Sequence, residues 1–199
     1  MLSHGRTLDD KFRVRDVQLK SVTNEQNRDY KKGVTLALDA IREYDMHLPR
    51  KPQIGFLSIE ELKLKRMLDS KAEILLQFPC MTDQRAVHVT RLLGHHLAYF
   101  SMLGGELSLS CLASVKVLRT ACMHGVCSET AAAIMLKATV TFWRERKYEL
   151  ACKYADLALC LSKRFLQIPG SRHAFIRVAA YSGVYPMLRP LHKSLGSSL

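Results

Sequence analysis

The chain has 199 residues, of which 48% are hydrophobic and 24% charged, and its formal net charge is +12. This length suits one domain with its own hydrophobic core, and the composition excludes a disordered or collagen-like chain. No run of about 18 apolar residues is present, and the polar first six residues lack the apolar segment of a secretory signal. We therefore expect a cytoplasmic protein that makes no membrane contact.

The positive charge is concentrated toward the C-terminus. Residues 140–199 carry 10 basic and 3 acidic residues, against 14 and 10 in residues 1–66 and 6 and 5 in residues 67–139. A surface of this sign could bind nucleic acid through its phosphates. The bases are dispersed on the solvent side of helical patterns, however, without the aromatic–basic motif of an RNA-binding sheet. We favour a solvated basic face. These bases are Arg144, Arg146, Lys147, Lys153, Lys163, Arg164, Arg172 and Arg177.

The six cysteines lie among apolar neighbours, so we expect small buried hydrophobic side chains in a reducing compartment and no disulfides. They are Cys80, Cys111, Cys122, Cys127, Cys152 and Cys160. The densest cluster, Cys122-Met-His124-Gly-Val-Cys127, has no second pair of ligands at the spacing of a structural zinc site. We therefore favour a structural role for it over metal binding.

Apolar residues recur every three or four positions along almost the whole chain, without a sustained two-residue alternation flanked by hairpin signals. This periodicity predicts an all-α fold. The predicted helices are, in chain order, 9–25, 27–44, 58–78, 83–103, 107–124, 128–143, 147–165, 171–181 and a last segment that begins at Pro186.

Proline, glycine and capping residues set these boundaries. Pro49 and Pro52 end the second helix, because proline lacks an amide donor and disfavours helical geometry in the residue before it. Ser58, with Glu61 three residues later, is a capping-box pattern that predicts the start of the third helix. Gly125 supplies the left-handed residue typical of a helix end.

Large and small residues alternate across the two helices at 128–165, as in a tetratricopeptide-type hairpin, and the small ones let the helices approach closely. The hairpin-packing residues are Met135, Ala138, Phe142, Tyr148, Ala151, Ala155, Ala158 and Leu159. A weaker version of the pattern surrounds Tyr30, which lies 118 residues before Tyr148, or three periods of roughly 39.

These patterns predict antiparallel helical hairpins stacked as a tetratricopeptide-like α-solenoid of about eight or nine helices. We expect one such domain over residues 1–199, as a fragment of a longer array, with disordered ends at 1–8 and 195–199. The alternative is an irregular helical bundle in which the alanines only satisfy local packing.

Four segments occur in an order that has a counterpart in a known family. They are Lys32–Ile41 with the following Leu48-Pro49 and Pro52, Leu76–Asp83, His124–Ser128, and Pro186–Leu191. Together they resemble the helical, tetratricopeptide-like region that follows the nucleotide-binding module in large STAND-type signalling ATPases. The resemblance extends over roughly residues 10–194. It implies a helical array that joins kinase-like, ATPase and output domains, such as a cyclase or histidine kinase.

The sequence departs from that family at three places. Cys80 stands where a hydrophobic residue is common, residues 144–146 read Arg-Glu-Arg where a Gly-Asp turn is usual, and Met187 occupies a site that is often aromatic. These departures leave the fold plausible and weaken the case for a retained partner surface.

No catalytic motif is present: the chain lacks a phosphate-binding loop, a G-x-S-x-G elbow, an H-E-x-x-H pair and the kinase signatures. The adjacent pairs Asp9-Asp10, Glu60-Glu61 and His95-His96 point about 100° apart on a helix and do not converge. Adjacent carboxylates usually mark a solvated helix start, and at most one histidine of the pair can face inward. Phe142 and Trp143 more often fill a core than stack a ligand.

We therefore expect a non-enzymatic scaffold without cofactor or metal, which contacts a protein partner or neighbouring domains of a signalling protein through the groove beside stacked hairpins. The alternative from another class is a basic helical module that binds nucleic acid in a salt-dependent way.

Overall fold

A computed structural model describes residues 7–22, 29–68, 72–143 and 145–166. Within these ranges all regular elements are helical, apart from one isolated β-bridge, so the predicted all-α class is confirmed there. The elements are α1 (Leu8–Val22), α2 (Tyr30–Arg42), α3 (Ile54–Leu68), the 3₁₀ helix η1 (Ala72–Leu76), α4 (Gln84–Arg91), the π-helix η2 (Leu92–Ala98), α5 (Tyr99–Leu103), α6 (Leu107–His124), α7 (Ser128–Trp143) and α8 (Tyr148–Arg164).

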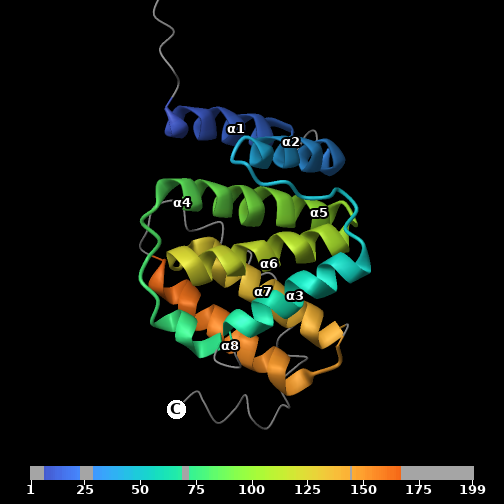
Figure 1. Cartoon of the computed structure of the whole chain (residues 1–199), viewed down its shortest axis with the longest axis vertical. Coiled ribbons are helices and arrows are strands. Elements are labelled where there is room, and N and C mark those ends of the chain that lie inside the picture. Colours follow the sequence, from blue (N-terminus) through green and yellow to red (C-terminus); the bar gives the residue numbers. More distant parts are fainter. Residues whose placement is uncertain (1–6, 23–28, 69–71, 144, 167–199) are drawn as a thin grey trace, which may run out of the picture.

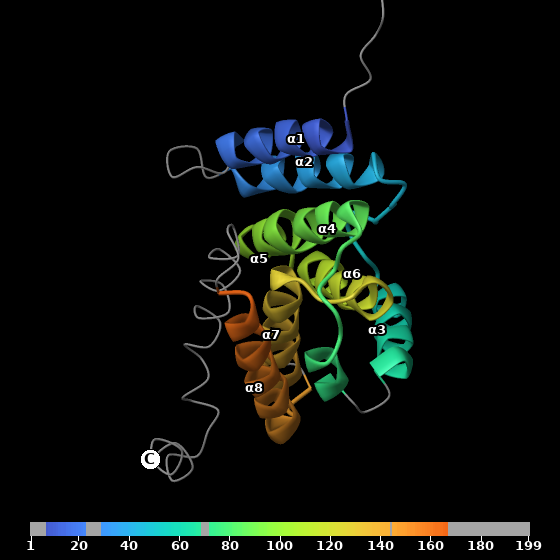
Figure 2. The same cartoon turned by 90° about the vertical axis from the view of Figure 1, so that its left-hand side faces the viewer.

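The helices follow one another through space in nearly the order of the sequence (Figures 1 and 2). The pair α1–α2 lies on the long rod formed by α4, η2 and α5, and that rod packs on α6. On its other side α6 contacts α7, which pairs with α8. Helix α3 departs from this succession, because it packs against α6 while η1 packs against α8.

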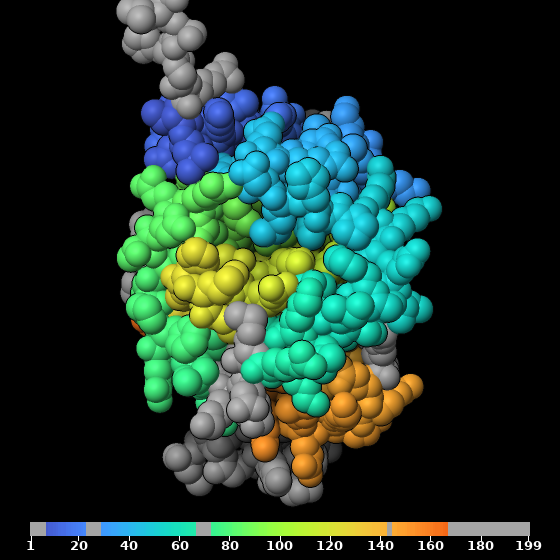
Figure 3. Space-filling model, in the orientation of Figure 1, coloured from blue at the N-terminus to red at the C-terminus, as the bar shows by residue number. Residues whose placement is uncertain are grey.

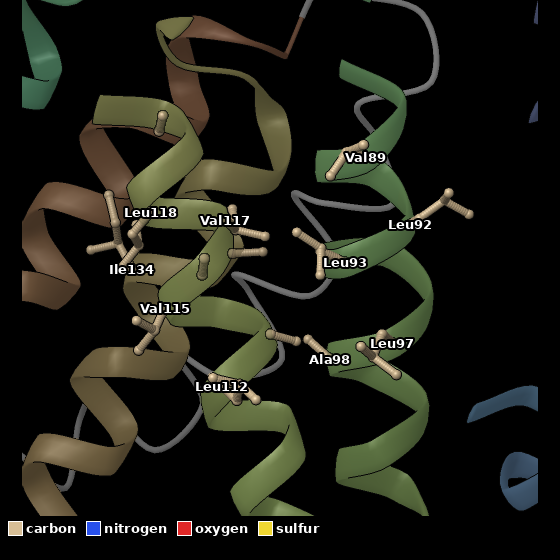
Figure 4. Close-up of a cluster of buried hydrophobic side chains, with 14 of the residues drawn as sticks. Val89, Leu92, Leu93, Leu97, Ala98, Leu112, Val115, Val117, Leu118 and Ile134 are labelled. Carbon is tan, nitrogen blue, oxygen red and sulfur yellow. The ribbon is translucent and has the colours of Figure 1, made fainter. Parts of the chain in front are cut away.

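The hydrophobic core runs through these layers without interruption. Leu93 of η2 and Val117 of α6 lie between their two helices, and Leu118 and Ile134 lie between α6 and α7 (Figure 4). Leu92 points in the opposite direction, toward α2. All five side chains are at most 2% exposed. Burial of such a side chain stabilises a fold by about 1.5–3 kcal/mol.

Several predicted boundaries are confirmed. Asp83 caps α4, where its carboxylate accepts a hydrogen bond of 2.9 Å from the backbone N–H of Arg85. The rod that begins there ends at Gly104–Gly105, as predicted. Helices α6 and α7 have the predicted bounds, and Gly125 between them has a φ of 95°.

The predicted capping box at Ser58 is wrong. Helix α3 already begins at Ile54, directly after Pro52-Gln53, so Ser58 lies in its second turn. Because the helix starts earlier, Leu57 lies within it and is buried in the core at 2% exposure. The single helix predicted over 58–78 is also wrong, since α3 ends at Leu68 and η1 forms separately.

The π-helix η2 was not predicted. It lies in the part of the α4–η2–α5 rod that contacts α1 through two histidine–aspartate pairs. His88 lies 3.1 Å from Asp9, and His96 lies 2.9 Å from Asp16. The two aspartates are seven residues apart, about two α-helical turns, whereas the two histidines are eight apart. The extra residue of a π-helical turn brings that longer interval onto one face.

Two loops distant in sequence are joined by the β-bridge between Cys80 and Val126. The backbone N–H of Met81 donates to the Val126 carbonyl at 2.9 Å, and the Val126 N–H donates to the Pro79 carbonyl at 2.9 Å. A Cβ on Gly125 would lie 2.5 Å from that Pro79 oxygen. The close approach therefore requires glycine at position 125, as does its φ of 95°.

Some predictions fall on residues outside the described ranges. The helix predicted over 171–181 and the segment from Pro186 lie there, so the expected total of eight or nine helices stays a prediction. Of the ends predicted to be disordered, 1–6 and 195–199 are outside, whereas Leu8 already belongs to α1.

Candidate functional site

The hairpin residues predicted from sequence all lie on α7 and α8, and those two helices contact each other closely. Five of the eight are at most 2% exposed: Met135, Ala138, Ala151, Ala155 and Ala158. Phe142 and Leu159 are half-buried. Tyr148 is 49% exposed, and its ring lies 5.0 Å from that of Phe142. These side chains form the seam of the hairpin, and none of them lines the cavity described next.

A cavity of about 630 Å³ lies between α3, η1, α6, α7 and α8. Its volume is in the range of about 300–1,000 Å³ typical of small-molecule sites. The apolar part of its wall comes from five side chains that are each at most 5% exposed: Leu64, Leu75, Leu118, Ile134 and Leu157. Leu62 and Leu150 line it closer to solvent.

A charged cluster occupies one part of the cavity wall. The Lys137 ammonium lies 2.9 Å from Glu145 Oε1 and 3.5 Å from Glu61 Oε1, and it therefore links α3 to the turn after α7. Lys147 lies 3.2 Å from Glu145. Burial opposes the charge of Lys137, but the hydrogen bond that its ammonium donates to Glu145 and the charge of Glu61 outweigh this effect and raise the lysine pKa. The four groups carry no net charge.

Thr141 lies one helical turn beyond Lys137 and also lines the cavity. Its residue is 0% exposed, and its hydroxyl has no hydrogen-bond partner in the described structure. The helical threonines Thr120 and Thr139 behave differently, because each hydroxyl donates at 3.0 Å to the carbonyl four residues earlier. An unsatisfied buried hydroxyl costs about 1–3 kcal/mol.

Glu60 forms a second ion cluster, on the α6 side of α3. Its carboxylate lies 2.6 Å from Lys116, 2.5 Å from Arg119 and 3.0 Å from Lys63, with the Glu60 side chain only 4% exposed. Burial raises the pKa of this carboxyl, but hydrogen bonds from the three cations lower it to about 2. The solvated position expected of an adjacent acidic pair is therefore wrong for Glu60, although it diverges from Glu61 as predicted.

Helix α3 lies at the molecular surface (Figure 3), and several of its apolar residues are exposed there. Ile54 is 70% exposed, Ile59 55%, Leu62 49% and Phe56 39%. We call these four residues the α3 stripe. Singly exposed apolar residues are normal, but several on one helix indicate a contact surface.

The remaining candidates from sequence lie apart from this region. His96 is fully buried and His95 half-buried, which confirms that at most one faces inward. Burial, together with the charge of Glu129, raises the pKa of the Cys127 thiol to about 12. Cys80 and Cys160 are exposed, contrary to the expected burial of every cysteine. No group of three or more His, Cys, Asp or Glu side chains within the described ranges is placed to hold a metal ion.

The cavity and the α3 stripe were missed from sequence, although α3 carried a signal. Between Ile54 and Arg66, the part of α3 whose side chains are described, the apolar residues on the buried face are Leu57 and Leu64, which are seven residues apart. The further apolar residues of the α3 stripe exceed what that face can bury. An apolar surplus of this kind indicates a second contact surface.

None of the helices described here is both long enough and apolar enough to cross a membrane. No protein-family model, no curated protein and no solved structure matches the chain.

Proposed function

We propose that the chain is a non-enzymatic helical-repeat scaffold, tetratricopeptide-like in architecture and derived from a signalling ATPase, which binds a protein partner or a neighbouring domain. The observation that carries the proposal is the α3 stripe, because it exposes four large apolar side chains on one helix, more than any other helix of the described residues exposes.

The spacing between α2, α6 and α8, each the second helix of a proposed hairpin, supports a repeat. Helices α2, α6 and α8 begin at Tyr30, Leu107 and Tyr148, which are 77 and 41 residues apart. These intervals are close to two periods and one period of roughly 39 residues. The intervening unit would comprise α3 and η1. Its shortened second helix accounts for the departure of α3 from the succession of layers.

The chemistry of the partner follows from the residues around the α3 stripe. Lys65 and Arg66 are exposed at the C-terminal end of α3. The surface therefore combines apolar side chains with positive charge. An amphipathic helix fits such a surface when its apolar face carries acidic residues at one end.

Site-specific photo-crosslinking in the cells that produce the protein tests this proposal. A benzophenone side chain at Ile59 should give one predominant protein adduct, and Arg66→Glu in the same chain should reduce its yield severalfold. The matched control carries the benzophenone at Val17 of α1, which is 65% exposed. Equal adducts from both positions, or none from Ile59, would contradict the proposal.

Nucleic-acid binding has less support within the described residues. Arg164 donates hydrogen bonds to the backbone carbonyls of Leu76 (3.3 Å) and Phe78 (2.7 Å), and Lys147 pairs with Glu145. These bases hold the fold together, which leaves fewer of them for phosphate contacts.

A further inference from the structure

We propose that the cavity between α3 and the α7–α8 hairpin is a binding site for a small, electrically neutral amphipathic molecule with a compact apolar body and one hydrogen-bonding head group. The site adjoins the α3 stripe proposed as the protein contact and shares Leu62 with it, whereas Ile54, Phe56 and Ile59 lie outside the cavity lining.

The apolar part of the cavity defines the body of the ligand. The walls there are leucine and isoleucine side chains from several different elements, so the pocket is built by tertiary packing and does not belong to one helix. Its volume of about 630 Å³ exceeds that of a few water molecules many times over. Apolar walls of this extent favour a ligand that gains by leaving water.

Thr141 defines the head group. Thr141 lines the cavity, and its hydroxyl is buried without a partner, although a helical threonine can donate to the carbonyl four residues earlier, as Thr139 does. A ligand group that donates to or accepts from this oxygen would satisfy it, and the buried setting strengthens such a bond.

The charged cluster disfavours a charged head group beside Lys137 and Thr141, whereas the other charged lining residues, Lys65, Glu73 and Lys153, are exposed to solvent. Lys137 is already held by Glu61 and Glu145, and Glu145 is shared with Lys147. A carboxylate or ammonium beside Lys137 would have to displace Glu61 or Glu145 and leave a partly buried charge without its counter-charge. A hydroxyl, amide or arylamine N–H head group meets no such penalty.

The test uses the full chain and N-phenyl-1-naphthylamine, a neutral probe with one N–H whose fluorescence rises in apolar surroundings. We expect saturable binding with one probe per chain. Thr141→Val keeps the shape of the side chain and removes the hydroxyl, so it should weaken probe binding about five- to tenfold, as the loss of one hydrogen bond predicts. Ser58→Trp, at an exposed lining position of α3, should fill the cavity and abolish binding.

Two controls locate the effect. Thr139→Val removes a hydroxyl from the same helix outside the cavity and should leave probe affinity unchanged. Ile59→Lys alters the α3 stripe alone and should also leave it unchanged, so that loss of the protein contact and loss of the ligand site are distinguished. Circular dichroism verifies that each variant is folded. Absence of saturable binding, or equal affinity in the wild type, Thr141→Val and Ser58→Trp, overturns the proposal.

Discussion

Replacing Gly125 with alanine should destabilise the protein by about 1–5 kcal/mol. Two effects add at this position. The φ of 95° with a ψ of 179° is a backbone conformation that residues with a Cβ rarely adopt, and it costs about 1–3 kcal/mol. The new Cβ would also lie 2.5 Å from the Pro79 carbonyl oxygen, and relief of such overpacking costs about a further 1–3 kcal/mol. Restriction of the unfolded chain by alanine offsets about 0.4–1 kcal/mol of the total.

Two other glycines separate these effects. Gly105 has a φ of 79°, and no atom lies within 4 Å of the position that a Cβ would take there, so Gly105→Ala should show the backbone effect alone, about 1 kcal/mol. Gly55 lies in α3 with open space around it and no positive φ, so Gly55→Ala should stabilise by about 0.4–1 kcal/mol. Urea unfolding followed by circular dichroism gives the three free energies. If Gly125→Ala loses no more stability than Gly105→Ala, the Pro79 carbonyl does not lie over Gly125 and the reasoning is refuted.

Three further predictions concern charge and packing. The Glu60 cluster should stabilise the fold above pH about 4.5 and lose this contribution as the pH falls toward 2, because the pKa of the Glu60 carboxyl is lowered in the folded state. Glu60→Gln should lower the free energy of unfolding by about 1–3 kcal/mol at neutral pH. The difference between the urea midpoints of this variant and the wild type should shrink on acidification. Burial lowers the pKa of His88, so the unfolded state binds more protons and stability should decrease as the pH falls through 6.5; a His88→Phe variant that keeps the same slope between pH 7.5 and 5.5 would contradict this. Ala158→Leu should destabilise the α7–α8 seam by about 1–3 kcal/mol, whereas Cys160→Leu on the exposed side of α8 should change the unfolding free energy by less than about 0.5 kcal/mol.

The elements that sequence predicted well are those in which local signals agree with packing. Helices α6 and α7 have regular apolar periodicity, and Gly125 between them can take a backbone conformation that other residues avoid. The η2 π-helix could not be predicted in this way. It packs against α2 and α6, and its His96 pairs with Asp16 of α1; no pattern within residues 92–98 contains these distant contacts.

The cavity could not be predicted because it arises where the expected helix 58–78 is interrupted. A continuous helix would have kept Leu75 on α3. In the structure Leu75 lies on η1, which packs against α8, and it is 1% exposed. The walls of the cavity therefore come from elements whose separation is decided by tertiary contacts. Thr141 gave no signal either, because a threonine in an apolar helix usually bonds to its own backbone.

The resemblance to signalling ATPases rests in part on two turn motifs, at residues 76–83 and 124–128, which the structure brings together through the Cys80–Val126 bridge. The two motifs therefore occur together because they pack against each other. The Pro79 carbonyl needs glycine at 125, and the extended backbone at 80–81 needs the carbonyl and N–H of Val126. A constraint of this kind acts on the interior of the fold and leaves its surfaces free to change. The motifs thus support the proposed architecture more strongly than the proposed partner, whose identity depends on the α3 stripe outside them.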